Sequence, residues 1–293
     1  MTYILYQGCA VWTSQYQYEI SARKILDFFG IDYIDFPEQQ CCGKPLACVN
    51  MNTWLVLAAR IMAIAEREGR DIITLCNGCY LSLNEAKKII MESHDEFSLI
   101  NNILSKENLK FTGFAKIKHI VKVISEDIGL KRIIENSRLK LDGLKLAIHY
   151  GCHVLRPREF SVDKNPEDPS IIEDILSSLG VSCPYYPEKF DCCMALLANV
   201  DVENADLIRG KKLLAIKRRG FDALVTICPL CQQSYELRQK KISRVLKEDI
   251  SIPVIYLTQL LGLSLGLHPR DLGLHLNESP VEKIIKRLGY ESL

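Results

Sequence analysis

Short runs of hydrophobic residues recur along the chain, and most are followed by a longer segment of helical character. The short runs predict buried strands, at residues 3–7, 31–36, 72–75, 144–150, 181–186 and 223–227. The longer segments predict helices, at residues 18–29, 53–68, 171–179 and 201–219. Because strands that alternate with helices are typical of parallel sheets, the pattern predicts an α/β fold with small, mainly parallel sheets flanked by helices.

The same features occur twice along the chain, in the same order and at a nearly constant distance. The repeated pairs are Gly8-Cys9 and Gly151-Cys152, Cys41-Cys42 and Cys192-Cys193, and Cys76-x-x-Cys79 and Cys228-x-x-Cys231. A repeat of this kind indicates two homologous halves, which we expect to be related by a pseudo-twofold axis. We place the first domain at residues 1–141, with a helical connector over about 92–141, and the second at residues 142–293.

The overall composition argues against several classes of protein. The chain has 37 Lys and Arg against 36 Asp and Glu, a net charge of +1, so it is not a strongly basic nucleic-acid binder. No apolar stretch approaches the roughly 18 residues that a membrane span requires. The N-terminus has no basic segment before an apolar run, so we expect no secretory leader and a cytoplasmic location.

Cysteine is the unusual residue of this composition, with twelve in 293 residues. This share of about 4% lies below the roughly 8–10% of a small disulfide scaffold. In the reducing compartment that we expect, clustered cysteines usually serve metal or redox chemistry. Cys48 and Cys183 have no counterpart in the other half, and we expect them to be small buried hydrophobic residues.

The other ten cysteines form two sets of five with nearly the same spacing. Several of them directly follow a predicted strand, and the carboxyl ends of parallel strands meet at one edge of a sheet. We therefore expect each set to converge on one site. The first set is Cys9, Cys41, Cys42, Cys76 and Cys79; the second set is Cys152, Cys192, Cys193, Cys228 and Cys231.

Five thiols per site favour iron–sulfur chemistry over the alternatives. A structural zinc ion takes four ligands, and a cubane [4Fe–4S] cluster also takes four cysteines. A fifth thiolate indicates that one sulfur bridges two irons, or that one iron position can open to a sulfur ligand from a substrate. Zinc and a redox-active disulfide between vicinal cysteines stay open as rival uses of the same residues.

The motif Cys41-Cys42-Gly43, with a preceding cysteine and a following Cys-x-x-Cys, resembles the cysteine-rich CCG domain. A chain of this length with two copies is similar to the B subunits of heterodisulfide reductase from methanogenic archaea. The resemblance runs from Gly8-Cys9 to Cys231. One departure is Cys193-Met194, where the first half has Cys42-Gly43; glycine there permits a close backbone approach, so the two sites need not be equivalent.

The resemblance implies a catalytic subunit that reduces the disulfide of coenzyme M and coenzyme B to two thiols. It implies two noncubane [4Fe–4S] clusters, one on each set, with the small-molecule disulfide between them. It also implies partners that supply electrons: a ferredoxin-like C subunit, with a flavin-containing A subunit, linked to a hydrogenase or a formate dehydrogenase. The sequence fits this need for partners, because it contains neither a compact ferredoxin motif nor a nucleotide-binding glycine motif.

A few further residues are candidates for the site because they lie near the ligands in sequence. His153 follows Cys152 and is a candidate proton donor, with a purely structural role as the alternative. Lys44, Arg156 and Arg158 are candidates to bind the anionic groups of the substrate. His149 lies in a predicted strand and is expected to be structural, and Lys211-Lys212 is expected on the exposed face of a helix.

Two other functions remain to be separated from the main one. CCG domains also occur in iron–sulfur subunits of dehydrogenases that pass electrons from glycolate, lactate, glycerol phosphate or succinate to quinones. There, the chain would be an electron relay. A non-catalytic zinc scaffold is the third possibility, and the fifth cysteine of each set argues against it.

Overall fold

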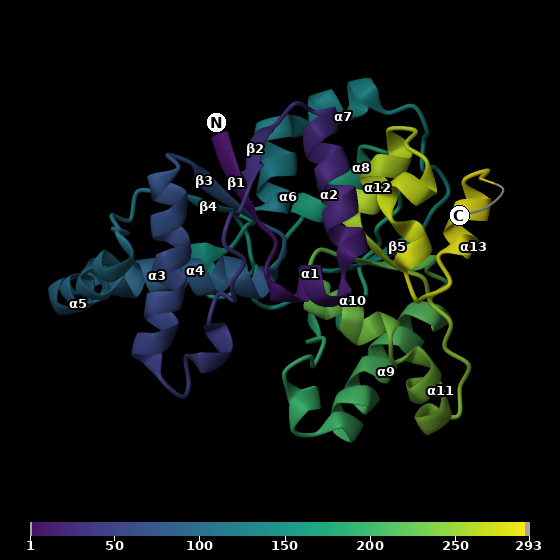
Figure 1. The fold of residues 1–293 in the computed structure, drawn as a ribbon. Coiled ribbons are helices and arrows are strands. Elements are labelled where there is room, and N and C mark those ends of the chain that lie inside the picture. Colours follow the sequence, from purple (N-terminus) through teal and green to yellow (C-terminus); the bar gives the residue numbers. More distant parts are fainter. Residues whose placement is uncertain (1, 291–293) are drawn as a thin grey trace.

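The protein contains two parallel β-sheets, one built from each half of the chain (Figure 1). The computed structural model describes residues 2–290. The first sheet has the order β2-β1-β3-β4, and the second has the order β5-β6-β7. The strands are β1 (Thr2–Tyr6), β2 (Asp32–Asp35), β3 (Asp71–Thr74), β4 (Ile117–His119), β5 (Leu146–His149), β6 (Ala223–Thr226) and β7 (Val254–Tyr256).

Helices flank both sheets, as the alternating pattern predicted. The helices of the first half are α1 (Cys9–Ser14), α2 (Tyr16–Phe28), α3 (Met51–Arg67), α4 (Asn77–Glu92), α5 (His94–Leu104), α6 (Ile120–Lys122) and α7 (Leu130–Asn136). The helices of the second half are α8 (Ile171–Ser177), α9 (Val202–Arg218), α10 (Pro229–Glu236), α11 (Gln239–Leu246), α12 (Leu257–Ser264) and α13 (Glu282–Arg287). The predicted α/β class with parallel sheets is therefore confirmed. Within residues 2–290, no helix has the length and apolar character needed to cross a bilayer.

Helices α3 and α9 show how closely the two halves match. Each has 17 residues and begins after a side-chain cap: Asn50 accepts from the Thr53 N–H, and Asp201 accepts from the Asn204 N–H, both at 3.0 Å. Each helix is followed by a glycine with positive φ, Gly69 at 63° and Gly220 at 67°. Positions in the two helices can therefore be compared one to one.

Two segments differ from the sequence prediction. Residues 181–186 do not form the predicted strand, and only one isolated bridge joins Ser182 to Lys145. Pro184 lacks the N–H that a further ladder bond needs, so pairing stops there. The segment expected as a helical connector, about residues 92–141, also contains β4, which pairs with β3 and extends the first sheet. Its counterpart in the second half is β7, which pairs with β6.

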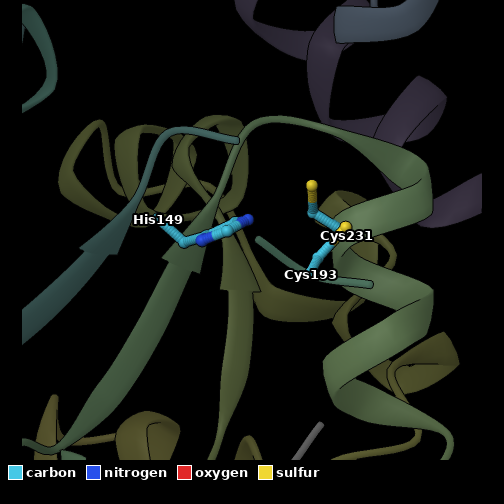
Figure 2. A group of neighbouring side chains, drawn as sticks. All are labelled: His149, Cys193 and Cys231. Carbon is cyan, nitrogen blue, oxygen red and sulfur yellow. The ribbon is translucent and has the colours of Figure 1, made fainter. Parts of the chain in front are cut away.

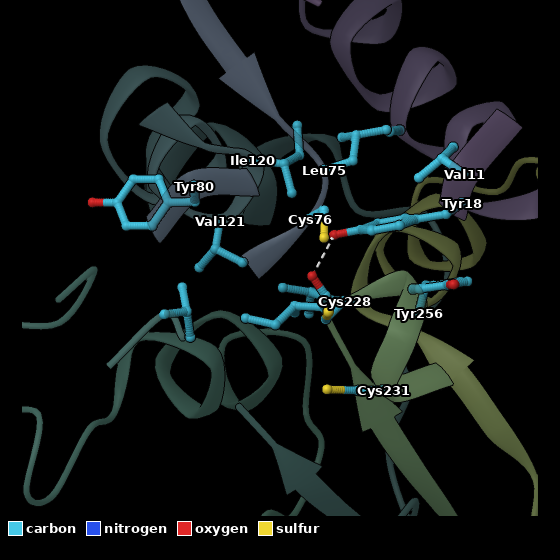
Figure 3. Packing of buried hydrophobic residues seen from close by; sticks show 14 of the residues in the cluster. Val11, Tyr18, Leu75, Cys76, Tyr80, Ile120, Val121, Cys228, Cys231 and Tyr256 are labelled. Atoms are coloured by element: carbon cyan, nitrogen blue, oxygen red, sulfur yellow. Dashed lines mark hydrogen bonds between the residues drawn. The ribbon is translucent and has the colours of Figure 1, made fainter. Parts of the chain in front are cut away.

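The two halves are joined by buried contacts between α2 and α12, which lie side by side (Figure 1). The rings of Tyr18 and Tyr256 stack with their centroids 4.0 Å apart. The Tyr18 hydroxyl donates to the Ile227 carbonyl at 2.9 Å, and the Ser21 and Thr258 hydroxyls lie 2.7 Å apart. Tyr18 also packs beside Cys76 and Cys228, one cysteine from each set (Figure 3). The interface therefore holds the ends of β3 and β6 together.

Replacing Tyr18 with phenylalanine tests this interface. The Ile227 carbonyl is buried, so loss of its donor is expected to lower the free energy of unfolding by about 1–2 kcal/mol. Tyr33→Phe is the control, because its hydroxyl bonds Asp27 at the surface, and its cost is expected to stay below about 0.5 kcal/mol. Urea unfolding measures both. Equal costs for the two variants would contradict the role of the Tyr18 bond.

Candidate metal centre

The cysteines gather at the carboxyl ends of the strands, the edge at which the sequence predicted them. Cys9 begins α1, and only Gln7 and Gly8 separate it from the end of β1. Cys76 caps α4 directly after β3 and Leu75, and Cys228 caps α10 in the same way after β6. The Cys-x-x-Cys motifs thus sit at helix N-termini, where the backbone N–H groups favour negatively charged sulfur.

Thiol–thiol contacts connect the ten cysteines into one continuous row. The first set runs in the order Cys9, Cys41, Cys42, Cys79, Cys76, and the second runs in the order Cys152, Cys192, Cys193, Cys231, Cys228. The two orders match position by position, with Cys9 corresponding to Cys152 and Cys76 to Cys228. The two rows meet where Cys76 contacts Cys228. The ten sulfurs therefore form two matching groups that share one contact.

Each group extends from the surface to the interior. Cys9 and Cys152 are exposed at the outer ends of the two rows. Cys76 and Cys228 are buried at the inner ends, together with the second cysteine of each Cys-x-x-Cys motif. A molecule from solvent can therefore approach each group at its first cysteine, whereas the two cysteines of the shared contact are buried.

The crowded thiols cannot all ionise without a cation nearby. Hydrogen bonds from Cys42 and then Cys9 lower the pKa of Cys41, which also receives the Gly43 N–H at 3.5 Å. Cys152 and then Cys193 lower the pKa of Cys192 in the same way. In contrast, Cys42 and Cys76 raise the pKa of Cys79, and burial adds to the effect. Bound metal removes this conflict, since it replaces the protons of all five thiols.

Two glycines allow the first cysteine of each set to approach the Cys-x-x-Cys thiols. Gly8 has a φ of 81°, and a Cβ atom on it would lie 2.8 Å from the Cys79 Sγ. Gly151 has a φ of 79°, and its Cβ would lie 2.6 Å from the Asn77 Nδ2 and 3.2 Å from the Cys231 Sγ. Both positions combine a left-handed backbone with contact distances that exclude any side chain. Five thiols packed in this way fit an iron–sulfur group better than a four-ligand zinc ion.

The departure at Met194 keeps the positive φ of its counterpart in the first set. Met194 has a φ of 56°, and Gly43, its counterpart, has a φ of 77°. Both residues are therefore left-handed, although only glycine adopts this conformation without strain. The substitution therefore keeps a left-handed backbone at this position of both sets.

His153 and the three candidate cations lie at different depths around the thiols. The His153 Nδ1 and the Cys76 Sγ each lie 3.7 Å from where a Cβ on Gly78 would be, so His153, which follows Cys152 of the second set, lies near the Cys-x-x-Cys motif of the first. Lys44 pairs with Glu85 and lies 4.5 Å from the Trp54 ring centroid. Arg156 pairs with Glu167 at 2.8 Å. Arg158 is exposed. Their roles in substrate binding stay predictions.

Two expectations about other residues were wrong. Cys48 is exposed rather than buried, because it lies in the loop that follows the first cysteine pair. Lys212 is buried rather than on the exposed face of its helix, although its neighbour Lys211 is exposed. Lys212 is the eleventh residue of α9, and the eleventh residue of α3 is the buried Ile61. Comparing the two halves position by position could have identified it.

Lys212 reaches His149, a residue expected from the sequence to be structural only. The Lys212 Nζ lies 2.9 Å from the His149 Nδ1, and the His149 Nε2 has no hydrogen-bond partner. Figure 2 shows the ring directed from the end of its strand toward Cys193 and Cys231. The ligand atoms of these three residues lie within 4.8 Å of one another. Burial lowers the pKa of Lys212 to about 7, while the charges of Asp191 and Cys231 oppose that shift.

Comparison with known proteins agrees with this arrangement. The cysteine-rich domain family named CCG matches residues 3–84 and 146–235. The chain is 32% identical to a heterodisulfide reductase B-subunit-like protein of Archaeoglobus profundus, covering 98% of this chain and 97% of the relative. It is 31% identical to the B subunit of a ferredoxin/F420H2-dependent CoB-CoM heterodisulfide reductase from Methanosarcina acetivorans, covering 93% of this chain and 92% of the relative.

Two further likenesses extend the comparison. The membrane anchor subunit of 8-methylmenaquinol:fumarate reductase from Wolinella succinogenes is 27% identical, covering 96% of this chain and 98% of that one. A crystal structure of a hypothetical protein from Helicobacter pylori superposes with a TM-score of 0.79 at 18% identity, covering 95% of this chain and 52% of that one. At this identity, the crystal structure supports the fold alone.

Replacing Gly8 with alanine tests the packing of the first set. The added Cβ would collide with the Cys79 sulfur, so we expect iron per chain to fall to roughly half of the wild-type value, with the second set still loaded. Gly30→Ala is the matched control: it has a φ of 65° but no heavy atom within 4 Å. Metal analysis of anaerobically purified protein measures both variants. Full iron content in Gly8→Ala would contradict the fit.

Proposed function

Because the chain belongs to the CCG cysteine-rich domain family, and matches B subunits of heterodisulfide reductase over nearly its whole length, we propose that it is the catalytic subunit of a heterodisulfide reductase. The similarity to these relatives supports an iron–sulfur subunit that is associated with an oxidoreductase. The proposal adds the reaction: reduction of the coenzyme M–coenzyme B disulfide to two thiols, as in methanogenesis.

The observation that carries the proposal is the paired arrangement of the thiols. Reduction of a disulfide takes two electrons and two protons and yields one thiol from each sulfur. The protein has two matching five-thiol groups that meet at Cys76 and Cys228, and each opens to the surface at its first cysteine. One group for each substrate sulfur accounts for the duplication of the whole chain.

Each set would hold one noncubane [4Fe–4S] cluster, and the clusters would supply electrons one at a time. The ligands would be the two cysteine sets already described. His153 follows Cys152 and lies near Gly78 of the first Cys-x-x-Cys motif, and it is the candidate donor for one of the two protons. Lys44 and Arg156 would bind anionic groups of the substrate only after leaving Glu85 and Glu167, whereas Arg158 is exposed and needs no such exchange.

The proposed reaction requires electrons from other subunits. The sequence has no compact ferredoxin motif that would add a further cluster to the chain. The named relatives are subunits of larger reductases. We propose that this chain receives electrons in the cytoplasm from a ferredoxin-like C subunit, together with a flavin-containing A subunit, and that both are linked to a hydrogenase or a formate dehydrogenase.

A second function is favoured by one relative. The Wolinella protein, named as the membrane anchor of a menaquinol:fumarate reductase, matches almost the full chain. In that case, the same two cysteine sets would pass electrons between a quinone pool and a partner dehydrogenase. The two functions differ in the small molecule that exchanges electrons with the protein, which is a disulfide in the first and a quinone in the second. An assay that compares these two molecules separates the functions.

We expect the anaerobically purified chain to oxidise a reduced viologen dye when the coenzyme M–coenzyme B disulfide is added. Cys193→Ala is expected to reduce this rate to background, because it removes a thiol from the middle of the second set. Cys48→Ala is the matched control, since Cys48 is exposed and lies outside both sets. Oxidation by a menaquinone analogue, with no response to the disulfide, would refute the reductase and favour the relay.

A further inference from the structure

The two thiol groups match, but the side chains that surround them do not. Tyr6 is the last residue of β1 and pairs with Thr74, and His149 is the last residue of β5 and pairs with Thr226. These two residues therefore occupy the same position in their sheets. The Tyr6 hydroxyl donates to the Gln40 carbonyl at 2.8 Å, so it is already engaged. His149 instead leaves its Nε2 directed at Cys193 and Cys231 (Figure 2).

Lys212 determines which nitrogen of His149 carries the proton. Its Nζ lies 2.9 Å from the Lys189 carbonyl, 3.3 Å from the Asp191 carbonyl and 2.9 Å from the His149 Nδ1. Three acceptors around one nitrogen match the three N–H donors of an ammonium group. With Lys212 as the donor, His149 accepts at Nδ1 and carries its proton at Nε2, from which it can donate toward the sulfurs.

A second cation supports the middle of the same set. The buried Arg209 donates from Nε to the Cys193 carbonyl and from Nη2 to the Met194 carbonyl, both at 2.8 Å. In the first set, the corresponding Cys42 carbonyl accepts from the neutral hydroxyl of Ser82 at 3.1 Å. The helix position of Arg209 is occupied in α3 by Ala58. Asp206 offsets part of the charge, because it contacts Arg209 and Arg238.

The shared contact is also unequal. The backbone N–H of Asn77, the first residue of α4, lies close to the Cys228 sulfur. The first residue of α10 is Pro229, which has no N–H, so Cys76 lacks the corresponding donor. The second set therefore differs from the first in three places. It has a histidine at the end of β5, a buried arginine on α9 and a backbone N–H beside Cys228. In each place, the first set has a weaker donor or none.

We propose that the second set holds the cluster with the higher reduction potential, and that His149, positioned by Lys212, is a main cause. Hydrogen bonds to cluster sulfur and nearby positive charge stabilise the reduced form, which carries one more negative charge. At equilibrium the electron resides first on the second set. The inference rests on the iron–sulfur part of the proposed function and is independent of the substrate.

The test is a potentiometric titration of the anaerobically purified chain, followed by electron paramagnetic resonance without any disulfide present. Lys212→Met is expected to shift only the higher-potential couple. At the midpoint potential of the wild-type protein, the ratio of reduced to oxidised higher-potential cluster should be about tenfold lower in this variant. This corresponds to a fall in midpoint potential of about 59 mV for a one-electron couple. Lys211→Met is the matched control, because Lys211 is the exposed neighbour on the same helix, and it should shift neither couple.

A second pair of variants keeps the test decisive if Lys212→Met loses its iron. His149→Gln retains an N–H donor near the sulfurs and should keep the higher potential, whereas His149→Leu should lower it. A shift of the lower couple, or of neither couple, would overturn the proposal. So would a strong nitrogen coupling that vanishes in His149→Gln, since it would make His149 an iron ligand instead. Loss of heterodisulfide activity alone would leave the potentials, and this inference, unaffected.

Discussion

The contact between Cys76 and Cys228 is the constraint on which the rest of the structure depends. Each of these cysteines is the residue at which a helix begins, and one residue separates it from a strand in the interior of its own half. To bring them together, the carboxyl ends of β3 and β6 must meet, and the Tyr18–Ile227 bond and the α2–α12 packing hold them there. Two separate domains with the same cysteines but without this contact would hold two distant sites.

The crowding of thiols explains why each five-cysteine set would be stabilised by a bound metal. Thiols that share hydrogen bonds in the interior cannot all become thiolates by themselves, because each ionisation opposes the next. Gly8 and Gly151 increase the crowding by letting a fifth thiol approach. The protein therefore holds the five thiols of each set in an arrangement that a multiply charged group would stabilise. Around that common core, His149, Lys212 and Arg209 distinguish the second site from the first.

Much of this organisation is predictable from the sequence, since strands that end at cysteines and a repeated spacing are local signals. The convergence of Cys9, Cys76, Cys152 and Cys228 follows from the geometry of parallel sheets. What could not be predicted depends on tertiary contacts. Residues 181–186 look like a strand from their hydrophobic run, although Pro184 within that run already argues against one. Lys212 looks exposed until its carbonyl partners surround it. The strand β4 has three residues, too few for a periodic signal.

The iron and acid-labile sulfide content of the anaerobically purified chain is the most direct measurement of the paired-cluster arrangement. Two four-iron clusters, one on each cysteine set, predict about eight irons per chain, together with sulfide. Zinc without sulfide would contradict this arrangement. A content of about four irons would also contradict it, because only one of the two matching thiol groups would then hold a cluster.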